Sequence, residues 1–188
     1  MDADEIVKRL QAPGGSVLAK MVERWGTGIV DEAGVLLRQK VADIVFSDPD
    51  ELKAIEEIVH PEVGREMMRQ MIEAAPSDRV VILDIPLLAE GARKNGGVVD
   101  RRGASGTIVV DCPPDVAVSR LVTYRNFDVD DARRRIEAQV SRDERLALAD
   151  FVVENGGDLA SLKGEIDRCW AWLVSLPPTD WSPPERDS

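Results

Sequence analysis

The sequence predicts an α/β protein built on a three-layer parallel β-sheet. Two continuous apolar runs predict buried strands, at residues 79–85 (RVVILDI) and residues 107–112 (TIVVDC). Each run is too short for a typical helix. A continuous apolar run is typical of a strand that is covered on both faces. A third short run, residues 151–153 (FVV), follows a helical stretch. Strands that alternate with helices favour parallel βαβ connections.

Length and composition limit the class of protein. The 188 residues suffice for one α/β domain, or for one with an inserted subdomain, and 44% hydrophobic residues can supply its core. A net charge of −11 argues against an extended nucleic-acid-binding surface. No apolar run approaches membrane-spanning length, and the N-terminal MDADEIVKRL is too charged for a signal peptide. We therefore expect a cytoplasmic protein without nucleic-acid or membrane partners.

The first third of the chain is predicted to be mostly helical. Apolar residues recur at helical spacing, and Gly and Pro clusters separate the segments. Helices are expected over residues 4–11, 17–25, 38–46 and 47–72. Ser16 is placed to cap the second helix. His60 and Pro61 should break or kink the last one, because proline removes a helical hydrogen bond.

The rest of the chain alternates helices with strands. A Gly- and Arg-rich loop is expected over residues 91–106, and Pro113-Pro114-Asp115 should open a helix after the second strand. A last helix, at about residues 158–176, has the spacing of a helix that lies on a sheet. The Pro-rich residues 177–188 predict a disordered tail. Cys112 and Cys169 lack metal-ligand spacing, so we expect both to be buried small residues.

An Arg-rich helix is predicted just before the third strand. Asp130 and Asp131 suit a helix N-terminus, and an apolar residue recurs every four positions after them. Around this stripe stand Arg133, Arg134, Arg135, Arg142 and Arg145. Guanidinium groups suit phosphate geometry, and ligands of α/β proteins collect beyond the carboxyl ends of strands. The alternative is a solvated helix with many ion pairs, since neighbouring acidic residues nearly cancel the arginines.

Other candidate residues are few. The 188 residues contain no GxxxxGK[ST] loop, and the Gly-rich residues 91–98 lack its Lys-Ser/Thr pair. Asp2 and Asp4 form a DxD pair that could hold Mg²⁺ through water or accept a proton from a hydroxyl, although a helix cap is the simpler expectation. His60 most simply marks a helix kink. No GxSxG, CxxC or HExxH pattern supports a hydrolase or a metalloenzyme.

Ten short segments, taken in chain order, resemble motifs of the dephospho-coenzyme A kinase family. Members of this family are P-loop kinases of the nucleoside-monophosphate-kinase type. The ten segments are Asp2-Ala3-Asp4, Pro13-Gly14, Trp25-Gly26, residues 34–38 (GVLLR), Val45-Phe46, Val59-His60-Pro61, residues 86–90 (PLLAE), Gln139 with Arg142, Ala149-Asp150 and Asn155-Gly156. The resemblance covers residues 1 to about 176. It favours a phosphate-binding role for the Arg-rich stretch over a solvated face.

The family phosphorylates the ribose 3′-hydroxyl of dephospho-CoA with MgATP, which is the last step of CoA biosynthesis. The resemblance implies Asp4 as the base and Arg142 as the cation that braces the transferring phosphoryl group. It implies Arg125 as a second phosphate clamp and Asn155 as a residue near the ATP adenine. The acceptor would be held by Asp2, Arg38, His60, Leu87 and Leu88, with Asp2 also able to contact Mg²⁺ through water.

The resemblance also implies how the chain is divided into regions, and the sequence departs from the family pattern in one respect. It implies a kinase-like domain at residues 1–176, with a helical acceptor-binding region at about 12–78 and a lid at about 125–146. The family begins with a strand, a GxxGxGK[ST] loop and a helix, and this sequence starts just after them. We therefore expect an N-terminally truncated kinase that is inactive as given, because the phosphates lose their cradle and lysine.

Two other functions compete with this expectation. A catalytically dead paralogue would bind dephospho-CoA or a protein partner in a regulatory role. Another nucleoside-monophosphate-type kinase is disfavoured, because the HP and PLL-x-E segments point to the coenzyme A branch.

Overall fold

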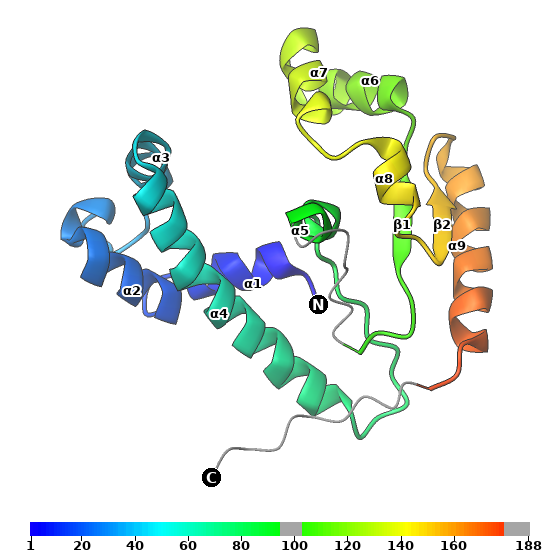
Figure 1. Ribbon diagram of the computed structural model, residues 1–188, viewed down its shortest axis with the longest axis horizontal. Helices are drawn as coiled ribbons and strands as arrows, with labels where there is room; N and C mark the ends of the chain where they lie inside the picture. The colour runs from blue at the N-terminus through cyan, green and yellow to red at the C-terminus, as the bar shows by residue number, and fades with distance from the viewer. Residues whose placement is uncertain (95–102, 179–188) are drawn as a thin grey trace. The chain divides into compact units, whose positions relative to one another are not determined.

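The computed structural model describes residues 1–94 and 103–178 (Figure 1). Its described residues fall into two compact units, one spanning Met1–Pro86 and one that begins at Leu87. Most of the predicted tail and part of the predicted loop at 91–106 lie outside the described residues.

The first unit is helical, as predicted. It contains α1 (Ala3–Leu10), α2 (Ser16–Trp25), the 3-10 turn η1 (Thr27–Ile29), α3 (Arg38–Ser47) and α4 (Pro49–Ala74). Local signals start two of these helices: the Asp2 carboxylate caps α1 through the Glu5 amide, and the Asp48 carboxylate caps α4 ahead of Pro49. The helical expectation for this part of the chain is therefore confirmed.

Two details of the helices differ from expectation. Ser16 is the first residue of α2 rather than its cap, and its hydroxyl donates to Glu62 of α4 at 2.9 Å. Of the break or kink predicted at Pro61, the break is wrong, because α4 is one helix through this residue. The kink stays a prediction. Since α1, α2 and α3 all pack along α4, their contacts compensate for the hydrogen bond that proline removes.

The core of the first unit lies between α2, η1, α3 and α4. Its buried members are Val17, Met21, Ile29, Val41 and Val45. Carboxylates of α4 add ion pairs at its edge: Glu62 binds Lys20 at 2.6 Å, and Glu66 binds Arg9 at 2.5 Å. These pairs tie the long helix to α1 and α2.

The predicted strand at residues 79–85 is not formed as a buried strand. Only Asp84 pairs, in parallel with Asp2, through bonds from the Asp84 amide to Met1 O and from the Ala3 amide to Asp84 O. Ile82 remains 55% exposed, and its two preceding valines are also exposed. A strand needs a hydrogen-bonded neighbour along its length, and the pairing described here extends only over the first residues of the chain.

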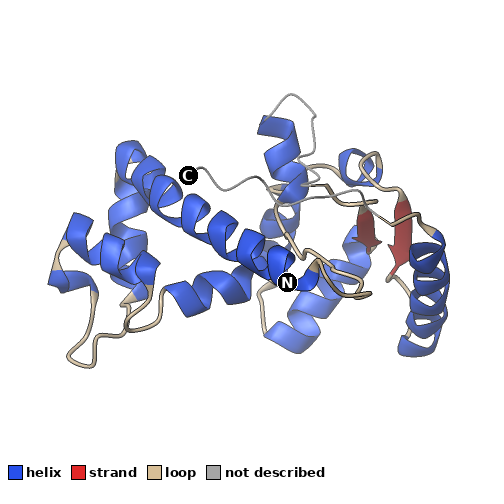
Figure 2. Ribbon diagram, turned by 90° about the horizontal axis from the view of Figure 1, so that it is seen from below, coloured by secondary structure: helices blue, strands red, loops and turns tan. Residues whose placement is uncertain are grey.

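The second unit contains the parallel sheet. Its elements are α5 (Leu88–Lys94), β1 (Ile108–Asp111), α6 (Pro114–Arg125), α7 (Val129–Glu137), α8 (Arg142–Leu146), β2 (Phe151–Glu154) and α9 (Leu159–Ser175). The strands β1 and β2 are parallel, with Ile108 opposite Phe151 and Asp111 opposite Glu154. Figure 2 shows the two strands side by side, next to α9. The α/β class with a parallel sheet is therefore confirmed.

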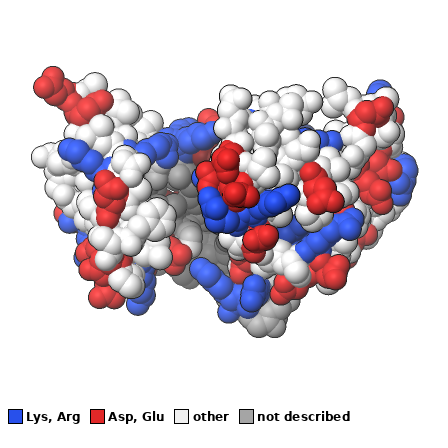
Figure 3. Space-filling view, turned by 90° about the horizontal axis from the view of Figure 1, so that it is seen from above, with Lys and Arg blue, Asp and Glu red and all other residues white. Residues whose placement is uncertain are grey.

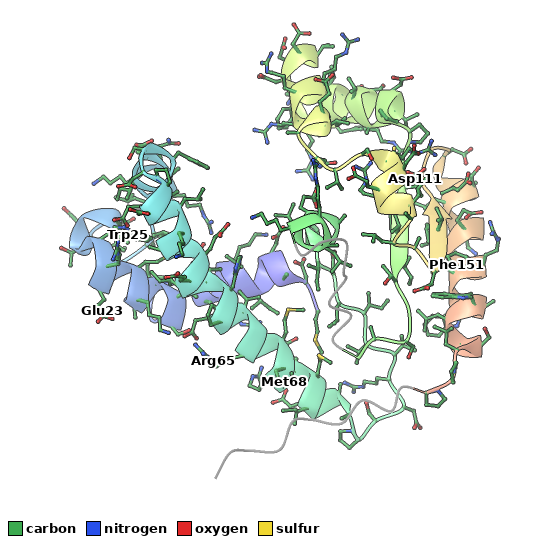
Figure 4. The ribbon with its side chains drawn as sticks, in the orientation of Figure 1. Glu23, Trp25, Arg65, Met68, Asp111 and Phe151 are labelled. Atoms are coloured by element: carbon green, nitrogen blue, oxygen red, sulfur yellow. The ribbon has the colours of Figure 1, made fainter. Side chains whose placement is uncertain are left out.

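Helix α9 packs against β2, although Leu159, Ile166 and Trp170, which belong to its predicted apolar face, remain exposed. Cys169 is buried, and Trp172 packs on Phe151 with ring centroids 5.1 Å apart. Figure 4 labels Phe151 on β2, beside this helix. A Cβ at Gly106 would lie 2.9 Å from the Trp172 ring, so a larger residue there would have to displace this ring.

Two expectations for the second unit are wrong. The predicted loop at 91–106 overlaps α5, which extends to Lys94. The predicted Arg-rich helix is two helices, because α7 ends at Glu137 and Ser141 starts α8. The reason is a capping box: Ser141 accepts the Glu144 amide, and the Glu144 carboxylate accepts the Ser141 amide.

Candidate functional site

The carboxyl ends of β1 and β2 carry the polar residues of the second unit. Asp111 ends β1, Glu154 ends β2, and the Asn155 amide donates to Asp111 O at 2.7 Å. Each strand leads into a helix, α6 or α9, whose N-terminus therefore lies near the same edge. Ligands of open parallel sheets bind at this edge, which makes its side chains the first candidates for a functional site.

Asp111 and Arg142 form a two-pronged ion pair at this edge. Arg142 Nε donates to both carboxylate oxygens at 2.9 and 3.0 Å, and Nη2 donates to Oδ2 at 2.6 Å. Asp111 is 5% exposed, whereas the Arg142 side chain is 45% exposed. Figure 4 shows Asp111 at the end of β1, beside α8. The pair anchors the guanidinium to the sheet and leaves part of it open to solvent.

The pair changes the acidity of both groups. Hydrogen bonds from Arg142, followed by its charge, lower the pKa of Asp111 below its usual value, although burial acts in the opposite direction. The same contact raises the pKa of Arg142. Asp111 is therefore an anion at neutral pH and a permanent acceptor for the guanidinium.

The sequence around Arg142 explains why it stands there. It is the first residue of α8, directly after the Ser141 cap. The segment before it is also fixed, since Val140 is 3% exposed and its carbonyl accepts Arg145 Nη1 at 2.5 Å. The Val140 amide donates to Glu90 of α5 at 3.4 Å. The buried Val140 and the Ser141 cap therefore set the start of α8.

A cavity of about 390 Å³ adjoins the ion pair. Its lining residues are Asp111, Pro113, Arg142, Glu154, Gly156, Gly157, Ser161 and Glu165. Arg142 Nη1 has no hydrogen-bond partner among the described residues, so it can donate to an anionic oxygen. The cavity therefore offers one anchored cation to an anionic ligand.

Arg120 of α6 binds the turn after β2. It donates to the Asn155 and Gly157 carbonyls at 2.6 and 2.8 Å, and to Asn155 Oδ1 at 3.1 Å. A second cavity, of about 400 Å³, lies on this side of the turn. It is lined by Asp115, Val116, Ser119, Arg120, Thr123, Tyr124, Gly156 and Gly157. Of the predicted site residues, Asn155 is thus placed beside the strand edge with Arg142.

The other predicted residues of the second unit stand apart from this edge. Arg125 is exposed at the C-terminus of α6, where a positive charge suits the helix dipole. Leu87 is 65% exposed, just before α5, and Leu88 is the first residue of α5 and half-buried. Their assignments stay predictions.

The predicted residues of the first unit lie on three helices. Asp2 caps α1, which was the simpler of its two expected roles, and Asp4 is exposed in the first turn. The Asp4 carboxylate has no hydrogen-bond or ion-pair partner in the described part of the chain. Arg38 begins α3 and His60 lies on α4, both exposed. Asp2 and Asp4 are therefore together on one turn, whereas Arg38 and His60 come from two packed helices.

Sequence reasoning missed Asp111 and Arg120. Asp111 gave one signal, a carboxylate at the end of an otherwise apolar run, where a buried charge needs a partner. Arg120 gave no signal other than its place in a predicted helix, because its hydrogen-bond acceptors are 35 to 37 residues away in the sequence.

Neither metal-binding clusters nor membrane spans are found in the described ranges. Residues 1–94 and 103–178 hold no group of three or more His, Cys, Asp or Glu side chains that could bind a metal ion. Among the same residues, no helix combines the length and the apolar character that crossing a membrane requires. Figure 3 shows acidic and basic side chains in small interspersed groups on the face in view.

The chain is similar to known proteins over most of its length. The family model described as dephospho-CoA kinase matches residues 1–161. A dephospho-CoA kinase of Streptomyces avermitilis is 41% identical over 174 residues, which cover 93% of this chain and 81% of that protein. One from Aromatoleum aromaticum is 37% identical over 171 residues, covering 91% and 80% respectively.

Solved structures have folds similar to that of this chain. The crystal structure of TT1252 from Thermus thermophilus has a TM-score of 0.68 and 30% identity, covering 92% of this chain and 83% of that one. The dephospho-CoA kinase from Campylobacter jejuni has a TM-score of 0.62 and 21% identity, with coverages of 91% and 82%. This second likeness supports the fold alone.

Proposed function

This chain belongs to the dephospho-CoA kinase family, and from that membership we propose that its residues serve phosphoryl transfer from ATP to the ribose 3′-hydroxyl of dephospho-CoA. One observation carries the assignment of roles within the chain. Arg142 is anchored by Asp111 at the strand edge, beside a cavity of about 390 Å³, and its Nη1 has no partner among the described residues.

Arg142 would stabilise the charge of the transferring phosphoryl group. In phosphoryl transfer negative charge spreads over three equatorial oxygens, and a positioned guanidinium is an effective partner for it. Asp111 already fixes the guanidinium through Nε and Nη2, so little reorganisation is needed when Nη1 meets a phosphoryl oxygen. We assign Arg125 as a second cation for the ATP phosphates and Asn155 to the adenine.

Asp4 would accept the proton of the attacking hydroxyl. The proposed base needs an unoccupied carboxylate, and Asp4 has no partner among the described residues. Asp2 suits this role less, because its carboxylate already accepts the Glu5 amide at 3.0 Å. We assign the acceptor substrate to the surface around Arg38 and His60 in the first unit, and to Leu87 and Leu88 in the second.

ATP reacts in such enzymes as its Mg²⁺ complex, in which the ion neutralises phosphate charge. Mg²⁺ is usually held by substrate phosphates with one or two carboxylates rather than by a complete protein cage. Asp2 is the carboxylate that we assign to the ion, through water.

The 188 residues do not contain the glycine-rich loop that cradles the β- and γ-phosphates in P-loop kinases. We therefore propose that these residues alone turn over little or not at all. The expected contribution of the loop is large, because its backbone amides and lysine bind the phosphates that react.

An assay of two proteins tests this proposal. One is the 188-residue chain, and the other, called the extended chain here, adds the strand, GxxGxGK[ST] loop and helix of a family member before Met1. ADP release and the mass of the CoA product are measured with ATP and dephospho-CoA. We expect 3′-phosphorylated product from the extended chain and background from the shorter one. Dephospho-CoA binding without product in both would instead favour a regulatory paralogue.

A further inference from the structure

Glu90 connects α5 with the segment that leads into α8. It is half-buried, and its Oε1 accepts the Val140 amide at 3.4 Å, over 50 residues of sequence. The distance is long for a hydrogen bond, but the carboxylate charge strengthens the contact. Glu90 takes no part in the proposed acceptor surface, which uses Leu87 and Leu88 of the same segment. Its contact is instead with the backbone two positions before Arg142.

The Val140 amide needs a partner of this kind. Val140 lies between two helices, because α7 ends at Glu137 and α8 begins at Arg142, and the residue is 3% exposed. A backbone amide that is buried outside regular structure has to find its acceptor elsewhere in the chain. Glu90 is that acceptor, while the Val140 carbonyl accepts Arg145 Nη1 at 2.5 Å. Both backbone polar groups of Val140 are therefore bound by side chains.

A second charge of α5 acts on the start of α8. The pKa of Glu144 is lowered below its usual value by hydrogen bonds from Ser141 and, to a smaller extent, by the charge of Arg93. Glu144 is the residue that completes the capping box with Ser141. Arg93 follows Glu90 by three positions, so the two side chains lie on one face of α5. This face provides an acceptor for Val140 and a favourable charge for Glu144.

These contacts hold the backbone of Arg142, whereas Asp111 holds its tip. The Asp111 carboxylate accepts Nε and Nη2, and the Ser141 cap with the buried Val140 sets where α8 begins. The guanidinium is planar, so a backbone shift that tilts it against Asp111 also moves Nη1. The direction of Nη1 toward the cavity therefore depends on the segment that Glu90 binds.

We propose that Glu90 is a positioning residue for phosphoryl transfer: by accepting the Val140 amide it fixes the segment that begins α8, and so holds Arg142 Nη1 in the direction of the phosphoryl group. This inference rests on the proposed function, in which Arg142 stabilises the charge of that group. In this role Glu90 contacts neither substrate, and its carboxylate serves as a hydrogen-bond acceptor rather than as a base or a ligand of Mg²⁺.

Two variants of Glu90 in the extended chain separate the hydrogen bond from the charge. Glu90→Met keeps the length of the side chain and removes the acceptor, so kcat should fall about 10- to 100-fold, the effect of misplacing a group that acts in the transition state. KM for ATP and for dephospho-CoA should stay unchanged, because the lost interaction is made only in the transition state. Glu90→Gln keeps a carbonyl oxygen for the Val140 amide and should retain kcat within roughly threefold of wild type.

A matched control and a double variant complete the kinetics. Glu137 is the exposed last residue of α7, three positions before Val140, and has no partner among the described residues. Glu137→Met should leave kcat and both KM values unchanged. Adding Glu90→Met to Arg142→Ala should lower kcat by less than about twofold, because Glu90 acts through Arg142. Losses that multiply in the double variant would contradict this dependence.

NMR of the ¹⁵N-labelled 188-residue chain follows the same contact without any enzyme activity. In Glu90→Met the Val140 amide should exchange with solvent faster than in wild type, and the Arg142 Nε–H signal should shift. Glu90→Gln and Glu137→Met should keep both signals as in wild type. Unchanged Val140 and Arg142 signals in Glu90→Met would overturn the inference.

The kinetic outcomes distinguish this inference from the proposed function. Wild-type kcat in Glu90→Met, or equal losses in Glu90→Met and Glu90→Gln, would overturn the inference and leave the kinase assignment intact. A raised KM for dephospho-CoA with unchanged kcat would also overturn it, because Glu90 would then support the acceptor surface on α5. An extended wild-type chain that makes no product would contradict the proposed function and, with it, the role of Glu90 in phosphoryl transfer.

Discussion

Asp111 and Arg142 are joined by three hydrogen bonds of 2.6 to 3.0 Å, although 31 residues separate them in the sequence. The pair links the end of β1 to the start of α8. It is asymmetric, because the carboxylate is 5% exposed and the guanidinium side chain is 45% exposed. Removing the arginine would leave a buried anion without a partner, which is more damaging than removing both groups.

The first prediction uses this asymmetry to separate catalysis from folding. Arg142→Ala in the extended chain should lower kcat by about 100-fold or more, the usual effect of losing a group that stabilises transition-state charge. It should also lower the melting temperature, because Asp111 stays buried. The double variant Asp111→Asn/Arg142→Ala should recover much of that stability without recovering kcat.

Arg142→Lys is the companion variant. Lysine keeps the positive charge but cannot reproduce the planar fork that binds both Asp111 oxygens. We expect intermediate stability and a kcat well below wild type. Steady-state kinetics and thermal melts of the four proteins check this prediction, and a wild-type kcat in either Arg142 variant would remove the residue from the phosphoryl site.

The second prediction concerns acid stability of the first unit. Hydrogen bonds from Lys20 and Ser16 lower the pKa of Glu62 from 4.5 to about 2, and those from Arg69 and Gln70 do the same for Glu66. A carboxyl with a lower pKa in the folded state stabilises the fold above its unfolded pKa. That contribution is lost as pH falls toward the folded value. Stability should therefore decrease between pH 4.5 and about 2.

Substitution of one glutamate tests the cause. Glu62→Gln should be less stable than wild type at neutral pH and should lose less stability on acidification, as measured by urea unfolding at several pH values. Glu57→Gln is the control, because Glu57 is 67% exposed and its ion pair is with Lys53 on the same helix. Equal pH profiles for Glu62→Gln and wild type would show that the pairs of Glu62 do not set the acid limit.

Local sequence signals predict most helices of this fold, because caps and apolar spacing act within a few residues. Asp2 and Asp48 cap α1 and α4, and Asp158 caps α9. The same kind of signal is present at Ser141, whose capping box starts a new helix inside a stretch that otherwise reads as one. The apolar spacing predicts the buried face of α7 at Ala132, whereas the buried Val140 lies beyond the end of that helix.

Long-range partners are harder to predict. The run at residues 79–85 has strand composition, but pairing depends on a neighbour that composition does not specify, and Ile82 is exposed. The binding of Asn155 by Arg120 likewise depends on how α6 lies against the end of β2. Arg142 can be predicted from its motif, whereas its pairing with Asp111 depends on how α8 lies against the end of β1.

The third prediction compares two glycines. A Cβ at Gly15 would lie 2.1 Å from the Leu10 carbonyl oxygen, so Gly15→Ala must shift the backbone between α1 and α2 and should destabilise the protein. A Cβ at Gly164, inside α9, would meet nothing within 4 Å, and alanine favours helix there. Gly164→Ala should therefore stabilise by about 0.5–1 kcal/mol. Chemical denaturation measures both changes, and stabilisation by Gly15→Ala would contradict the close approach.

The fourth prediction separates the two acidic residues at the start of α1. Asp4 has a carboxylate without a described partner, whereas Asp2 caps the helix. In the extended chain, Asp4→Asn should lower kcat by about 100- to 10,000-fold, the range for loss of a general base, with an unchanged melting temperature. Asp2→Ala should instead lose about 1 kcal/mol of stability through its cap.

Asp2→Asn completes this comparison, because asparagine caps helices about as well as aspartate does. We expect it to keep wild-type stability, so any change in its kcat reports on Mg²⁺ or substrate rather than on the fold. A magnesium titration of kcat for the three variants separates these roles. Should Asp4→Asn keep its activity while Asp2→Asn loses it, the proton acceptor would be Asp2, and the absence of a described partner for Asp4 would have no catalytic meaning.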